Sequence, residues 1–140
     1  MMEYELTIFG QPVGKARPRF TRTGHTYTPQ ATKDYEELVR YTFVSGYPKA
    51  KPIEGAVKAT IIAYYQIPKS YSKKKRQECL DCYLPVQSKP DCDNIAKIIL
   101  DSLNGYAYID DKQINDMRVF KLWSDMPRVE VKIEEGLICK

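Results

Sequence analysis

The chain has 140 residues, of which 43% are hydrophobic and 29% are charged, and this composition excludes a disordered protein. Its length predicts a single domain over residues 1–140 with a core of its own, while the net charge of +4 is too small to indicate a partner by itself. No apolar run approaches the roughly 20 residues that span a bilayer, and the first ten residues carry acids where a signal peptide carries bases. We therefore expect a cytoplasmic protein that does not contact a membrane.

The first half of the chain predicts a strand, a loop, a helix and a second strand. Residues 3–9 alternate between polar and apolar side chains, as a strand does, and residues 10–27 are a loop with glycines and prolines. Thr28 followed by Pro29 predicts an N-cap and a first helical residue, for a helix that runs to about Val44. Residues 56–66 are rich in β-branched and aromatic side chains and predict a central strand.

The second half predicts two helices and two strands. Ser70 or Ser72 caps a basic helix that ends near residue 82, and a second helix over about 93–103 stops at Asn104-Gly105. Residues 116–123 and 128–134 both alternate and are separated by a short turn, which predicts a hairpin. The element order β-α-β-α-α-β-β indicates an α+β fold, in which helices pack against one mixed β-sheet.

The second of these helices carries a continuous polar stripe. A residue advances an α-helix by about 100°, and on this wheel five polar side chains share one arc while the apolar ones face the other way. The polar residues are Asp93, Asn94, Lys97, Asp101 and Asn104, and the apolar ones are Ile95, Ile99, Leu100 and Leu103. A solvated helix face explains this stretch by itself, because Asp93 and Lys97 form a favourable i, i+4 pair.

A second acidic pair, Asp110 and Asp111, follows that helix after a single turn, within the stretch GYAYIDDKQ. A chain that runs back along the helix can bring one of these carboxylates near the helix start. Clustered carboxylates raise one another's pKa unless a cation relieves them, and Mg²⁺ suits such hard oxygen ligands. A calcium loop counted from Asp91 is excluded, because Ala96 stands where that loop needs glycine and Ser102 where it needs glutamate.

Two basic runs are candidates for binding nucleic acid. The first contains Lys15, Arg17, Arg19 and Arg22, with Phe20 and Tyr27 close by. Bases on a loop can neutralise phosphates, and aromatic rings can stack on unpaired bases; the alternative is an ordinary exposed basic loop. The second run, Lys73, Lys74, Lys75 and Arg76, lies on the basic helix and can equally be its solvated face.

The four cysteines do not predict a zinc site. Cys79 and Cys82 have the spacing of one half of a zinc knuckle, but a second close pair is missing and His25 is the only histidine. Cys92 and Cys139 are isolated. We expect reduced thiols.

The acidic segment resembles the signature of RusA-type Holliday-junction resolvases. The resemblance rests on Asp91-x-Asp93-Asn94, then Lys97, Asp101, Leu103 and Asn104-Gly105, then Asp110-Asp111-x-Gln113. The stretches KARPRFTRTGHTYTP and PKSYSKKKR also resemble family members of phage and Gram-positive origin. Together these stretches touch most of the chain.

The resemblance implies a site, a metal and a partner. Its three essential acids fall on Asp91, Asp93 and Asp111, as ligands of Mg²⁺ with Mn²⁺ as a substitute, and its essential lysine falls on Lys97. Asn94, Asp101 and Asp110 also match the pattern as supporting residues. Family members are homodimers that nick four-way DNA junctions at two symmetric places in recombination and repair, inside bacterial or phage-infected cells.

Two other functions remain open on the sequence alone. One is a metal-dependent nuclease for other branched or single-stranded nucleic acid, which would use the same acids. The other is a basic, non-catalytic DNA-binding dimer whose acids only cap helices. The apolar residues of the last two strands are candidates for a dimer interface or for the sheet's own packing; they include Val119, Phe120, Leu122 and Trp123.

Overall fold

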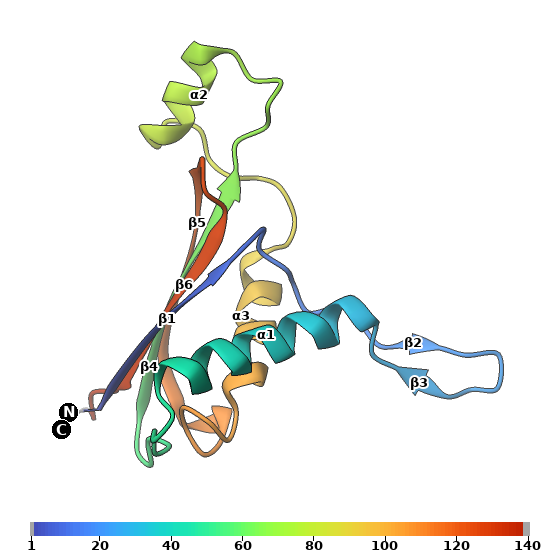
Figure 1. The fold of residues 1–140 in the computed structure, drawn as a ribbon, viewed down its shortest axis with the longest axis vertical. Coiled ribbons are helices and arrows are strands. Elements are labelled where there is room, and N and C mark those ends of the chain that lie inside the picture. The colour runs from blue at the N-terminus through green and yellow to red at the C-terminus, as the bar shows by residue number, and fades with distance from the viewer. Residues whose placement is uncertain (1, 139–140) are drawn as a thin grey trace.

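The computed structural model describes residues 2–138 and confirms the predicted α+β class (Figure 1). The strands are β1 (Glu3–Phe9), β2 (Arg19–Phe20), β3 (Thr26–Tyr27), β4 (Val57–Gln66), β5 (Ile114–Ser124) and β6 (Arg128–Glu135). The helices are α1 (Gln30–Gly46), α2 (Lys73–Leu80) and α3 (Cys92–Leu103), and a short 3₁₀ turn, η1, spans Asp111–Gln113. The helix α1 begins one residue later than predicted, so that Pro29 takes the N-cap position.

The four long strands form one mixed sheet in the order β1-β6-β4-β5. The predicted hairpin of the last two strands is wrong, because β4 lies between them and pairs with both, parallel to β5 and antiparallel to β6. The helices α2 and α3 separate β4 from β5 in the chain. They return the chain to the end of the sheet where β4 began, and a parallel neighbour requires such a crossover.

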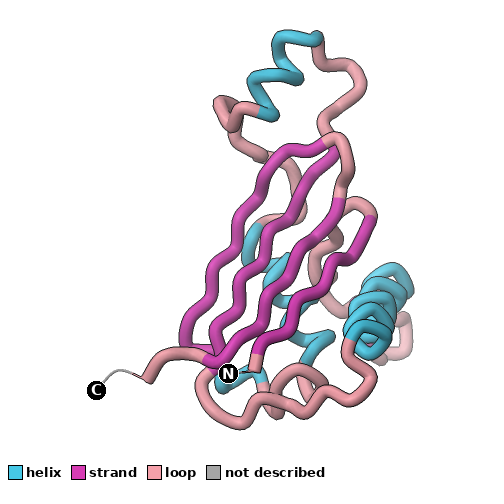
Figure 2. The backbone as a smooth tube through the Cα atoms, turned by 60° about the vertical axis from the view of Figure 1, so that its left-hand side comes forward, coloured by secondary structure: helices cyan, strands magenta, loops and turns pink. Residues whose placement is uncertain are grey.

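Helices α1 and α3 pack on the same face of the sheet and against each other. Figure 1 shows both on one side of the strands, and in Figure 2 the strands lie in front of the helices. Alternate residues of β4 are fully buried beneath them, among them Val57, Ile61 and Ala63. Burial of a large apolar side chain contributes about 1.5–3 kcal/mol, so this layer of helices on sheet forms the core.

The polar stripe predicted for α3 is confirmed. The opposite face of the helix is buried through Ile95, Ile98, Ile99 and Leu103, each with 0% exposure, whereas Asp93 and Lys97 are exposed. The helix ends as predicted, because Gly105 follows the C-cap residue Asn104 with a φ of 84°, a conformation that favours glycine.

Two segments extend from this body. Residues 16–28 form a segment that we call the arm. Residues 10–27 were predicted as a loop, but the middle of the arm forms the two-stranded ribbon of β2 and β3. Strands of two residues are too short for an alternating pattern to reveal them. Figure 1 shows the arm projecting away from α1 and α3, while α2 lies beyond one end of the sheet.

The thiols and the helix lengths complete the description of the fold. Cys79, Cys82 and Cys92 carry free thiols, and Cys139 lies outside the described residues. Among residues 2–138, every helix is too short or too polar to cross a membrane.

Candidate functional site

A cavity of about 470 Å³ lies between α3 and the start of β5, and we call it the acidic cavity. Its charged lining comprises Asp93, Lys97, Asp101, Asp111 and Asp116, and the rest of the lining is Ala96, Leu100, Ile114, Asn115 and Met117. The structure therefore brings one member of each predicted acidic pair, Asp93 on α3 and Asp111 after it, to the same cavity.

Helix α3 presents its part of this lining because Asp93, Lys97 and Asp101 are each four residues apart and so lie on one face. The Nζ atom of Lys97 is 3.3 Å from Oδ2 of Asp101. The Lys97 side chain is 60% exposed while that of Asp101 is 22% exposed, so the amine reaches into solvent from a carboxylate that is held closer to the protein. Asp93 lies in the first turn of α3, where the helix dipole favours a negative charge.

The two acids at the start of the 3₁₀ turn η1 have different roles: Asp110 caps the turn and Asp111 faces the acidic cavity. The Asp110 carboxylate accepts the Lys112 backbone N–H at 3.0 Å, and the Asp110 N–H donates to the Gln113 side chain at 2.8 Å, which is a capping box. Gln113 in turn donates to the Ile53 carbonyl at 2.7 Å, which ties the turn to the chain that precedes β4. Asp110 therefore holds the turn in place, and Asp111 lines the acidic cavity.

The two neighbouring carboxyls of η1 have opposite pKa shifts. A hydrogen bond to Asp110 raises the pKa of Asp111, and partial burial and the negative charges of Asp110 and Asp101 raise it further, against the opposing effect of Lys97. The backbone N–H of Lys112 is the main cause that lowers the pKa of Asp110. The acidic cavity is thus crowded with negative charge, and an added cation would relieve it.

The lining fits the chemistry of Mg²⁺, which takes hard oxygen ligands and keeps several of its waters. Within residues 2–138, however, no three acidic, thiol or imidazole side chains converge closely enough to hold a metal ion among themselves. The cavity offers carboxylates that face one space, and the proposed ligand set stays a prediction.

Asp91, the third predicted acid, does not line the acidic cavity. It is the N-cap residue of α3 and lines a neighbouring cavity of about 570 Å³. The other residues of that cavity are Gly14, Lys15, Arg17, Lys89, Pro90 and Asn94. The N-terminus of α3 therefore separates two cavities, with Asp93 on one side and Asp91 beside the root of the arm on the other.

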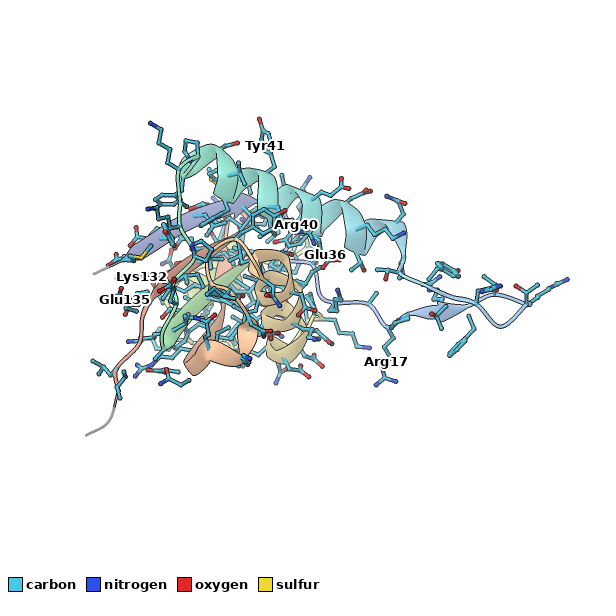
Figure 3. The ribbon with its side chains drawn as sticks, turned by 90° about the horizontal axis from the view of Figure 1, so that it is seen from below. Arg17, Glu36, Arg40, Tyr41, Lys132 and Glu135 are labelled. Atoms are coloured by element: carbon cyan, nitrogen blue, oxygen red, sulfur yellow. The ribbon has the colours of Figure 1, made fainter. Side chains whose placement is uncertain are left out.

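The predicted DNA-binding residues lie at three places in the fold: on the arm, at its root, and on α2. Arg17, Arg19 and Arg22 are exposed on the arm, and Figure 3 shows Arg17 near its root. Lys15 instead forms ion pairs with Glu36 and Asp101. On α2, beyond the end of the sheet, Lys73, Lys74 and Lys75 are exposed, and Arg76 pairs with Asp125.

Sequence reasoning missed two acids of this region. Asp116 was interpreted only as the start of a strand, although it follows the acidic pair by five residues. Glu36 is 8% exposed and belongs to the buried stripe of α1 with Thr32, Tyr35, Val39 and Phe43. An acid on an otherwise apolar helical stripe is the signal that could have predicted a buried cationic partner for Glu36.

Comparison with known proteins identifies the family of this chain. The chain matches the family model of endodeoxyribonuclease RusA over residues 10–134, a range that includes the arm, α2, α3 and both cavities. It is similar to the uncharacterized protein YqaN of Bacillus subtilis (strain 168), with 37% identity over 136 residues, covering 94% of this chain and 95% of the relative. Because the match extends over nearly the whole chain, the protein belongs to the RusA endodeoxyribonuclease family.

Proposed function

We propose that this protein is a Mg²⁺-dependent endonuclease that resolves four-way DNA junctions by paired symmetric nicks, as part of recombination and repair in the cytoplasm of a bacterial or phage-infected cell. The observation that carries the proposal is the acidic cavity, where Asp93 and Asp111 come together with Lys97 in a chain of the RusA family. The adjoining cavity adds Asp91 and the arginine at the root of the arm.

In this proposal Asp91, Asp93 and Asp111 hold Mg²⁺, directly or through water, and Mn²⁺ can replace it. Bound Mg²⁺ would supply Lewis-acid chemistry at a phosphate oxygen and lower the pKa of a water nucleophile. Lys97 acts as a point charge on the phosphate as negative charge builds there during the reaction. Its ion pair with Asp101 orients the amine, at 3.3 Å in the free protein, and Asn94 and Asp110 support α3 and η1.

The exposed arm supports binding to DNA. Its arginines can neutralise backbone phosphates. Phe20 is 76% exposed and Tyr27 is 46% exposed, and rings so placed can stack on bases that are unpaired at the centre of a junction. The same rings fit single strands equally well, which keeps a nuclease of broader substrate range as the second candidate.

Substrate preference is the first test. With Mg²⁺, we expect a synthetic four-way junction to be nicked at two symmetric positions, faster than a linear duplex or a single strand of the same sequence, and chelation of the metal should stop cleavage. Equal rates on all three DNAs would favour the broader nuclease. Tight binding to the junction without cleavage in Mg²⁺ or Mn²⁺ would favour a non-catalytic DNA-binding protein.

The second prediction concerns the carboxylates. Asp91→Asn, Asp93→Asn and Asp111→Asn should each lower the single-turnover cleavage rate by at least about 10-fold, because loss of a metal ligand costs no less than loss of a group that only hydrogen-bonds to a ligand, which costs about 10–100-fold. Junction binding should stay intact or tighten, since negative charge next to a polyanion is removed. Asp34→Asn is the matched control, because Asp34 is an exposed acid of α1 outside both cavities. A normal rate for Asp93→Asn would refute the ligand set.

The third prediction concerns the arm. Arg17→Ala and Arg19→Ala should weaken junction binding, and each should reduce the slope of log Kd against log salt by about one if its arginine neutralises one phosphate. At saturating enzyme the cleavage rate should change little. Lys49→Ala removes the same charge from an exposed site away from the arm and should leave the slope unchanged. An unchanged slope in both arginine variants would remove the arm from the DNA interface.

The fourth prediction is a twofold homodimer, because residues 2–138 of each chain contribute the acidic cavity once and a junction needs two symmetric nicks. Val119 and Trp123 pack against the domain's own core, whereas Phe120 is 47% exposed and stays a candidate for the interface. Sedimentation equilibrium in the micromolar range should give a dimer, with and without a junction. A monomer that makes unpaired nicks would contradict junction resolution and favour the broader nuclease.

A further inference from the structure

Lys15 differs from the other bases of the first basic run in the atoms that it contacts. Its Nζ lies 3.0 Å from Oε2 of Glu36 on α1 and 3.5 Å from Oδ2 of Asp101 on α3. Its backbone N–H donates to the carbonyl of Asn94 at 3.0 Å. Only 26% of its side chain is exposed, whereas Arg17 and Arg19 extend into solvent. One residue therefore joins the root of the arm to both helices.

The preceding residue brings the backbone close enough for these contacts. A Cβ atom on Gly14 would lie 2.6 Å from Cβ of Pro90 and 3.0 Å from Cβ of Asn94. Real side chains do not approach so closely, so glycine is required here and the loop lies directly on the start of α3. We call residues 14 and 15, with their contacts, the joint.

Glu36 explains why the amine of Lys15 is held in place. The Glu36 side chain is 11% exposed, and its other cationic neighbour, Arg40, is farther away at 3.9 Å; Figure 3 shows Glu36 where α1 passes α3. A buried carboxylate without a partner is strongly destabilising. The Lys15 amine therefore neutralises the Glu36 carboxylate and is not available to bind a DNA phosphate.

Asp101 connects the joint to the acidic cavity. Its Oδ2 atom is shared by Lys15 at 3.5 Å and Lys97 at 3.3 Å. The Asp101 carboxylate thus has two cationic partners, and its position in turn influences where the Lys97 amine lies. The joint thus links the arm to the lysine that faces the cavity.

We propose that Lys15 is a positioning residue: it fixes the arm to α3 and, through Asp101, orients Lys97 for the nuclease reaction. This inference rests on the proposed function and changes the role expected for Lys15, which its place in a basic run assigned to DNA binding. A phosphate ligand contributes mainly to affinity, whereas a positioning residue contributes mainly to the rate at saturation.

Lys15→Met keeps most of the side-chain volume and removes the charge. We expect the single-turnover cleavage rate at saturating enzyme to fall by about 10–100-fold, the cost of a small misplacement at a reacting centre. The Kd for the junction should stay within about twofold, and the salt slope should not change, because the Lys15 amine neutralises no phosphate. Lys15→Arg should recover most of the rate, and Lys49→Met, at an exposed lysine outside both cavities, should behave as the parent.

A double variant separates positioning from stability. Lys15→Met alone leaves Glu36 buried without its nearest cation and should lower the Tm. Adding Glu36→Gln removes both charges of that pair, so the Tm should return toward that of the parent. The cleavage rate should stay low, because Asp101 still lacks its second cation. A rate that recovers together with the Tm would overturn the proposal and leave Lys15 a purely structural role.

Two further results would also overturn the proposal. One is a weaker Kd and a shallower salt slope with a normal rate at saturation, which is the behaviour of a phosphate ligand. The other is amide hydrogen exchange of residues 13–17 that Lys15→Met leaves unchanged, since we expect faster exchange once the joint loosens. This last measurement needs no cleavage. If the parent protein cuts no DNA while exchange still increases in the variant, the proposed function fails and the joint stands.

Discussion

Burial of the apolar face of α3 is the constraint on which the site depends. Ile95, Ile98, Ile99 and Leu103 have no exposed surface, and rotation of the helix about its axis would bring one or more of them into water at about 1.5–3 kcal/mol each. The opposite stripe is therefore fixed toward solvent, and Asp93, Lys97 and Asp101 are fixed with it. The core therefore determines which face of α3 points to solvent, while contacts within the site act on the ends of its charged side chains.

The charges of the site are balanced by contacts that come from outside α3. The acidic cavity has four aspartates and one lysine, Lys97, in its lining. Because Lys97 pairs with Asp101, the other three carboxylates of the cavity have no cation from its lining. Lys15 adds a second cation behind Asp101, while η1 uses Asp110 to cap its own backbone. What remains facing the cavity is Asp93, Asp111 and Asp116, an excess of carboxylate that suits a divalent cation.

Local pattern predicted α3 and its polar stripe well, because helical periodicity and the Asn104-Gly105 stop depend only on neighbouring residues. Contacts between residues that are distant in the chain could not be predicted in this way. Alternation identified β5 and β6 as strands, but it carries no information about which strand lies beside which, and β4 separates them. Glu36 and Lys15 are 21 residues apart, and their pairing follows from how α1 crosses α3. The resemblance in the motif marked Asp91 and Asp93 as one cluster, yet α3 begins between them and directs them to different cavities.

That division at the start of α3 bears on how binding and cleavage are connected. Asp91 shares its cavity with Arg17 of the arm, and Asp93 shares the other with Lys97. In the proposed function, a DNA strand bound by the arm would pass the first turn of α3 on its way to the acidic cavity. Gly14 and Lys15 fasten the arm at this turn. A shift of the arm would therefore act directly on the helix that carries both Asp93 and Lys97, so the joint connects the position of the arm with the geometry of these charged groups.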